Sequence, residues 1–214
     1  MNKYYQLPLG ALGANCYIIP APENKAVVID PASSTEVLMF LKSNDLTLGS
    51  IVITHGHFDH FAGVPALVRE TGAEVIAPKD DVGMLASAVK SWADFMPMTP
   101  FEPVTPDRTF SDGEEFTASG VEFRAMSAPG HTLGSTILFC PTLGNVAFTG
   151  DVIFAGAVGR TDGFSGSALQ MRESLRKLGA LEGDYTLLCG HGESTTLETE
   201  KSFNPYMAPF GERR

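Results

Sequence analysis

Short apolar runs, separated by Gly, Pro and Asn, recur along most of the chain. Runs of this length predict buried strands, because strands are shorter than helices and turn residues mark their ends. On this pattern we expect strands over residues 16–19, 26–30, 50–54, 73–77, 121–126, 135–140, 145–148 and 185–189.

Apolar residues at helical spacing lie between several of these runs. One helix is predicted over the residues after Ser33 or Ser34, either of which could cap it. A second helix is expected to start after His60 and to end at Gly72, and a third covers residues 168–178.

Many strands with fewer helices indicate an α+β protein in which sheets pack together and helices lie outside. No repeat, low-complexity tract or linker interrupts the chain. We therefore expect a single domain over residues 1–214.

The segment from Asp81 to Pro106 differs from the rest because it is rich in Met, aromatic residues and Pro. One interpretation is a helix packed in the core and followed by an irregular connection. The other is a flexible apolar flap over a pocket, since Met-rich surfaces adapt to varied ligands. The second would suit a substrate with some hydrophobic surface, and the sequence leaves both open.

Composition narrows the choice of partner and compartment. The chain has 214 residues and a formal net charge of −10, without a run of Lys or Arg, so nucleic acid is not expected as a partner. Its three cysteines are widely spaced, which indicates neither a disulfide framework nor a thiolate zinc site. No apolar run approaches the ~20 residues that span a bilayer, and the first residues lack a signal-peptide pattern. We expect a cytoplasmic protein without a membrane partner. The sequence does not determine its oligomeric state.

All five histidines lie in three Gly-containing motifs, each at the end of a predicted strand. The first, THGHFDH, contains His55, His57, Asp59 and His60; the second, APGHTLGS, contains His131; the third, CGHGE, contains His191. A fourth motif, FTGDV, contributes Asp151. Loops at strand ends allow a rigid scaffold to aim several polar groups at one point.

Three imidazoles and a carboxylate within six residues are costly to bury unless a cation takes their lone pairs. His55 and His57 would point the same way in an extended segment, whereas Asp59 and His60 would turn towards a second centre. A lone histidine in a turn is more often capped or exposed, so the argument depends on the motifs occurring together. The donors exceed what one tetrahedral ion needs, which predicts two divalent ions, zinc first, with iron or manganese as alternatives.

A family resemblance is carried by GANCYII, VVIDPA, ITHGHFDHFAG, APGHTLGS, FTGDVIFAGAVGRTD and CGHGESTT, in this order. On these motifs the chain resembles the metallo-β-lactamase-fold hydrolases, and within them the glyoxalase II-like (hydroxyacylglutathione hydrolase-like) branch. The resemblance covers nearly the whole chain and is more specific for the superfamily than for the branch. It implies a four-layer αβ/βα sandwich with the metals at one edge of the sheets.

The resemblance also implies a role for each site residue. It assigns the first metal to His55, His57 and His131, the second to Asp59, His60 and His191, and a bridging position to Asp151. We take Asp59, as the candidate proton acceptor, and His191 as the catalytic residues. Asp30 is implied to orient the HGHFDH loop by hydrogen bonds, with a plain turn carboxylate before Pro31 as the alternative.

Two features depart from the larger glyoxalase II enzymes, which carry a C-terminal helical domain that helps to bind glutathione. Little sequence follows His191, so we expect that domain to be absent. Arg160 falls where those enzymes place a cation for the carboxylate of the thiol substrate, and we expect it to bind substrate. A solvated surface charge is the alternative for Arg160.

These residues predict a metal-dependent hydrolase that cleaves a small thioester, hydroxyacylglutathione-like, with an activated water. A thiolate of pKa ~8.5 leaves without much help, which suits a site with no spare histidine to protonate an amine. A sulfur (persulfide) dioxygenase with a single iron retains the HxHxDH string and is the first alternative. A nuclease of the same fold is disfavoured by the acidic charge, and a β-lactamase by the missing signal peptide. A binding protein without activity would be expected to lack some of the seven ligands.

Overall fold

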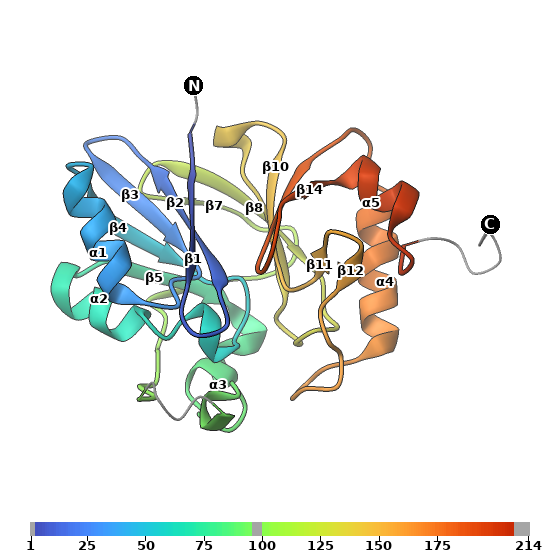
Figure 1. Ribbon diagram of the computed structural model, residues 1–214, viewed down its shortest axis with the longest axis horizontal. Coiled ribbons are helices and arrows are strands. Elements are labelled where there is room, and N and C mark those ends of the chain that lie inside the picture. Colours follow the sequence, from blue (N-terminus) through green and yellow to red (C-terminus); the bar gives the residue numbers. More distant parts are fainter. Residues whose placement is uncertain (1–2, 96–99, 208–214) are drawn as a thin grey trace.

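The computed structural model describes residues 3–95 and 100–207. Two six-stranded sheets lie at its centre (Figure 1). The first sheet follows chain order, with β1 (Tyr5–Leu9), β2 (Ala14–Pro20), β3 (Lys25–Ile29), β4 (Thr47–Val52), β5 (Glu74–Pro78) and β6 (Arg108–Phe110). The second sheet has the spatial order β14 (Thr195–Thr196), β13 (Thr186–Cys189), β10 (Val146–Gly150), β9 (Thr136–Phe139), β8 (Val121–Ser127) and β7 (Glu115–Ala118). A small hairpin pairs β11 (Ile153–Phe154) with β12 (Ala157–Val158).

Helices lie on the outer sides of both sheets (Figure 1). The first sheet is covered by α1 (Ser34–Ser43) and α2 (Val64–Thr71), and the second by α4 (Ala168–Gly179) and α5 (Leu197–Phe203). The single turn α3 (Val82–Leu85) follows β5. This helix–sheet–sheet–helix order confirms the predicted α+β sandwich. Among the described residues, no helix combines the length and apolar character that crossing a membrane requires.

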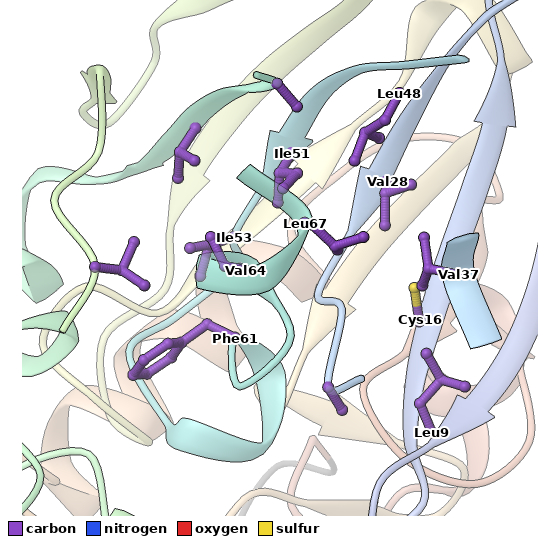
Figure 2. Close-up of a cluster of buried hydrophobic side chains, with 14 of the residues drawn as sticks. Leu9, Cys16, Val28, Val37, Leu48, Ile51, Ile53, Phe61, Val64 and Leu67 are labelled. Atoms are coloured by element: carbon purple, nitrogen blue, oxygen red, sulfur yellow. The ribbon is translucent and has the colours of Figure 1, made fainter. Parts of the chain in front are cut away.

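The apolar runs are nearly continuous because both faces of the central strands are buried. Successive side chains of a strand point to opposite faces, so Cys16 and Ile18 of β2 pack against the helices while Tyr17 and Ile19 pack between the sheets. Figure 2 shows the outer layer, in which Val37 of α1 and other buried side chains lie along the strands. The alternation of faces thus gives one chain segment contacts in two core layers.

Most predicted elements are present, with shifted ends. The strand expected at residues 50–54 is β4, which begins earlier and ends at Val52. Ser33 is the N-cap of α1, although its hydroxyl donates to the Glu36 carboxylate rather than accepting from the backbone. Gly72 ends α2 with a φ of 68°, a left-handed conformation that glycine adopts without steric cost. The patterns missed β1, β6, β7, β14, the β11–β12 hairpin and α5.

The segment from Asp81 to Pro106 lies closer to the first of its two interpretations. Its helix is only the turn α3, whose Met84 and Leu85 are buried, and the rest is mostly irregular. Val104 is also buried, whereas Val89 and Phe95 are exposed. Both ends are therefore fixed in the core, while the middle combines exposed Val89 and Phe95 with buried Ser91 and Ala93. Met96, Pro97 and Met98 lie outside the described residues.

Candidate metal centre

The four histidine and aspartate motifs come together at the ends of strands from both sheets. His55 and His57 follow β4, and Asp59 and His60 lie in the 3-10 turn Phe58–His60. The other three residues follow strands of the second sheet, with His131 after β8, Asp151 after β10 and His191 after β13. The structure therefore brings all seven residues of the proposed site together across the seam between the sheets.

The first group of donors contains His55, His57 and His131. Their candidate ligand atoms all lie within 4.8 Å of one another, and all three residues are buried. His57 Nδ1 is 2.7 Å from His131 Nε2. This is the set expected to hold the first metal.

The second group contains Asp59, His60 and His191, also with ligand atoms within 4.8 Å. His191 Nε2 is 3.3 Å from both His60 Nε2 and Asp59 Oδ2. The His191 side chain is 28% exposed, so the second group faces the opening of the site.

Asp151 lies between the two groups. Its Oδ1 is 3.4 Å from His60 Nε2 in the second group, and its Oδ2 is 3.4 Å from His131 Nε2 in the first. Oδ2 is also 3.6 Å from His191 Nε2, so this carboxylate lies near histidines of both groups, as a bridging ligand would.

Hydrogen bonds to Asp30 fix the orientation of His60. The Oδ1 of Asp30 accepts from the Thr54 backbone N–H at 2.8 Å, and its Oδ2 accepts from the Thr54 hydroxyl at 2.6 Å. Oδ2 is also 3.0 Å from His60 Nδ1. Because a carboxylate only accepts, Nδ1 carries the hydrogen and the lone pair of neutral His60 is on Nε2, which faces Asp151. Asp30 is thus placed to orient the ligand loop, as the resemblance implied.

The same reasoning fixes two more imidazoles. His131 Nδ1 is 2.8 Å from the Arg160 carbonyl, which can only accept, so its lone pair is on Nε2. His55 Nδ1 is 3.0 Å from the Thr54 hydroxyl, whose hydrogen is committed to Asp30, so His55 Nδ1 donates and its Nε2 points inward. Hydrogen bonds that orient metal-binding histidines in this way are typical of metal sites.

Three buried polar atoms have no hydrogen-bond partner in the described part of the chain, namely His55 Nε2, His57 Nε2 and Asp151 Oδ1. An unpaired buried polar atom costs about 1–3 kcal/mol. Lone pairs converging on one region, without hydrogens to share, fit divalent cations. Nitrogen and carboxylate donors in this ratio suit zinc, iron or manganese.

The charges of the site also favour bound cations. Burial lowers the pKa of His57 to about 3, with a further contribution from His131, so this ring stays neutral and able to bind metal. Burial alone would lower the pKa of His60, but Asp151, Asp59 and Asp30 together raise it to about 10. The carboxylates therefore create a site that favours positive charge.

Hydrogen bonds from side chains of β2 to the backbone hold the His191 loop against the first sheet. The Tyr17 hydroxyl and the Asn15 amide both donate to the Cys189 carbonyl, at 2.7 and 3.0 Å. Gly190 is required by close packing, since a Cβ there would lie 2.2 Å from Asp151 Oδ1. Cys189 itself is a buried strand residue, as expected, and not a member of either donor group.

Asp81 is a site residue to which the sequence analysis gave no role. It is fully buried, and its Oδ2 accepts from the Gly56 N–H at 2.8 Å and from the Thr132 hydroxyl at 2.6 Å. Its Oδ1 accepts from the Gly134 N–H at 2.8 Å. Asp81 thus joins the loops of His57 and His131, and no local pattern reveals a contact between residues so far apart in the chain.

Arg160 lies beside the site rather than within it. Its guanidinium pairs with Asp162 through Nε at 2.8 Å and Nη2 at 3.1 Å, and it stacks over Trp92 at 4.3 Å from the ring centroid. A cavity of about 640 Å³ adjoins Arg160 on the side of α4, with Met171 and Tyr206 also in its wall. Arg160 is therefore tethered, although its side chain is half exposed.

Comparison with known proteins agrees with this geometry. A family model described as the metallo-beta-lactamase superfamily matches residues 9–191. The chain is 34% identical to hydroxyacylglutathione hydrolase GloC of Haemophilus influenzae, over 94% of this chain and 96% of that protein. It is similar to the crystal structure of BLEG-1 B3 metallo-beta-lactamase, with a TM-score of 0.88, 28% identity and coverage of 97% and 100% of the two chains. For TTHA1623 in a di-iron-bound form the TM-score is 0.84, with 29% identity and coverage of 94% and 99%.

Proposed function

This chain belongs to the metallo-β-lactamase superfamily, and we propose that it is a metal-dependent hydrolase that cleaves small thioesters at a two-metal site. The observation that carries this proposal is Asp151, which lies between the two donor groups, with Oδ1 3.4 Å from His60 Nε2 and Oδ2 3.4 Å from His131 Nε2 and 3.6 Å from His191 Nε2. One ion would be held by His55, His57 and His131, and the other by Asp59, His60 and His191, with Asp151 shared. The similarity to a hydroxyacylglutathione hydrolase over almost the whole chain supports a thioester as the substrate.

Two divalent ions would lower the pKa of water towards ~7 and polarise a carbonyl group. Zinc is our first choice, with iron or manganese as alternatives, and the similarity to TTHA1623 in a di-iron-bound form supports iron among them. The protein's own contribution is orientation, because Asp30, Thr54 and the Arg160 carbonyl hold three imidazoles with their lone pairs inward.

Asp59 and His191 lie on the open side of the site and are the proposed catalytic residues. Against the effect of burial, His60 and His191 hold the pKa of Asp59 well below its usual range. Asp59 is therefore ionised, as a metal ligand must be, and from its position on the open side of the site we propose its Oδ2 as the acceptor of the proton that water loses. The reaction breaks the C–S bond and adds water, giving a carboxylic acid and a thiol. The leaving thiolate, of pKa ~8.5, needs no protein acid.

Arg160 is the proposed contact for a carboxylate on the substrate. Its hydrogen bonds to Asp162 use two of the five N–H groups of a guanidinium, which leaves others for an anion. We further propose that the substrate is a small molecule and that nucleic acid is not a partner, because the chain carries a net charge of −10.

Metal analysis combined with a small substrate panel tests the proposal. We expect close to two metals per chain and cleavage of a thioester. The His57→Ala and Asp151→Ala variants should each lose the bound metal and the cleavage activity. Asp107→Asn, which alters an exposed carboxylate that accepts a hydrogen bond from the Val75 N–H of β5 and belongs to no donor group, is the matched control. A metal-free His57→Ala protein with full turnover would refute the proposal.

The same panel separates the alternatives. One iron per chain, with oxygen uptake on a persulfide, would identify a sulfur dioxygenase. A β-lactam belongs in the panel because of the similarity to a B3 metallo-beta-lactamase. Cleavage of the β-lactam without thioester cleavage would overturn the proposed substrate class while leaving the metal site intact.

A further inference from the structure

Trp92 stands at the edge of the candidate metal centre. Its ring centroid lies 6.4 Å from that of His57, in an edge-to-face arrangement. Its backbone has a φ of 67°, which is unusual for a bulky residue and costs of the order of 1–3 kcal/mol. Such a conformation persists only where the surroundings hold it, so the backbone at Trp92 is fixed by its neighbours.

Arg160 provides one of the contacts that hold Trp92. The guanidinium lies 4.3 Å from the centroid of the indole ring and is itself fixed by Asp162. The Arg160 carbonyl also accepts from His131 Nδ1, so one residue contacts both a proposed metal ligand and the indole. The backbone of Gly163 lies against the same ring, since a Cβ there would be 3.2 Å from Trp92 Nε1. The indole is therefore placed relative to the metal donors through short, direct contacts.

Exposed apolar side chains occur in the segments that carry Trp92, Arg160 and His131. Phe95 lies 5.0 Å from Trp92 between ring centroids and is 73% exposed. Phe164, from the loop that also carries Arg160, and Leu133, two residues after His131, are exposed as well. Leu133 and the Phe164 loop are joined by a hydrogen bond from the Leu133 N–H to the Ser165 hydroxyl. Exposed apolar residues in segments that also carry Trp92, Arg160 and His131 are consistent with contact to an apolar part of a ligand.

We propose that Trp92, stacked on Arg160, forms an apolar subsite that binds the acyl arm of the substrate and favours a flat, aromatic arm. This inference rests on the proposed function for the identity of the substrate and extends it to a substrate class. The cation on one side of the indole and the imidazole at its edge hold the ring in place before the ligand binds. Aromatic rings contribute attraction beyond their buried area when they stack offset or edge to face.

Binding can be measured without turnover, because Trp92 is the sole tryptophan of the chain and its fluorescence reports on the subsite. The metal-loaded protein is titrated with two thioethers of N-acetylcysteine that it cannot hydrolyse, the S-(2-phenylethyl) and the S-ethyl compound. We expect a saturable change in fluorescence with the phenylethyl compound, at a Kd about tenfold or more below that of the ethyl compound. Equal affinities, or no saturable change with either compound, would overturn the subsite.

Hydrolysis provides the second measurement, with S-phenylacetyl and S-acetyl thioesters of the same thiol. We expect Trp92→Ala to lower the ratio of kcat/KM between phenylacetyl and acetyl substrates about tenfold, and Trp92→Phe to retain most of the ratio. Phe203→Ala, which removes an exposed aromatic side chain from α5, is the matched control. Equal metal content in all variants shows that the site is intact, and an unchanged ratio in Trp92→Ala would overturn the proposal. If the wild type with both metals bound cleaves no thioester, the proposed function fails, and the fluorescence titration still decides on the subsite.

Discussion

Replacing Asp30 by Asn tests whether hydrogen bonds behind the ligands determine metal binding. Asn keeps the size of the side chain and tolerates the backbone φ of 51° at this position. However, Asp30 accepts three hydrogen bonds, two at Oδ2 and one at Oδ1, and an amide can only accept at one of these positions. One end of the amide must therefore face groups that require an acceptor.

The two orientations of the amide have different costs. With the NH₂ group facing the Thr54 backbone N–H, two buried donors oppose each other, which costs about 1–3 kcal/mol of unfolding free energy. With the NH₂ group facing His60 Nδ1, it donates there and the imidazole hydrogen moves to Nε2, which points at the second metal position. Losing such an orienting contact typically costs 10–100-fold in metal affinity, equivalent to about 1.4–2.7 kcal/mol.

Two measurements on the Asp30→Asn variant test the expected losses of stability and of metal affinity. Urea unfolding of the metal-free protein gives the loss of stability, and competition with a chromogenic chelator gives the affinity for each metal. We expect the free energy of unfolding, the free energy of metal binding or both to weaken by more than 1 kcal/mol. The more weakly bound of the two metals should dissociate first. Asp107→Asn makes the same chemical change at an exposed carboxylate and should leave metal affinity unaltered. Wild-type stability together with wild-type affinity for both metals in Asp30→Asn would refute the reasoning.

Three further substitutions probe other contacts of the site. Asp81→Ala leaves three buried donors without an acceptor and should reduce the unfolding free energy by about 3–5 kcal/mol, measured by urea titration; a loss below 1 kcal/mol would contradict this reading. Gly190→Ala places a Cβ 2.2 Å from Asp151 Oδ1 and should lower metal content in elemental analysis, whereas Gly83→Ala, with open space around its Cβ, should retain both metals. Tyr17→Phe removes a buried hydrogen bond and should cost about 1 kcal/mol at pH 7. Burial raises the pKa of Tyr17 above 10. As pH rises past 10, Tyr17 ionises in the unfolded chain but not in the folded protein, so the wild type loses stability. The Phe variant should lose less stability over that range.

The sequence was informative wherever a signal was local. Apolar runs predicted most of the strands, and the spacing of His55, His57, Asp59 and His60 predicted a metal site before any contact was known. Short motifs of this kind carry their own chemistry, because the donors are neighbours in the chain.

These local patterns did not predict contacts between residues that are far apart in the chain. Asp81 lies in a segment that local periodicity describes only as a helix or a loop, yet its carboxylate joins two ligand loops. The stacking of Trp92 on Arg160 likewise links residues from opposite halves of the chain. The edge strands β1 and β7 were missed because half of their positions face solvent, which interrupts the apolar run on which strand prediction depended.

The anchoring of the His191 loop to β2 has a consequence for the order in which the protein folds. The hydrogen bonds from Asn15 and Tyr17 to the Cys189 carbonyl join residues 174 and 172 positions apart. Pairings of such sequence separation form slowly, because a long loop must close before they contribute any stability. During synthesis, the four donors of the HGHFDH motif leave the ribosome long before β13 does. We therefore expect an early intermediate that can capture a metal at the HGHFDH motif, and a mature centre that is completed only when β13, which precedes His191, has docked in the second sheet.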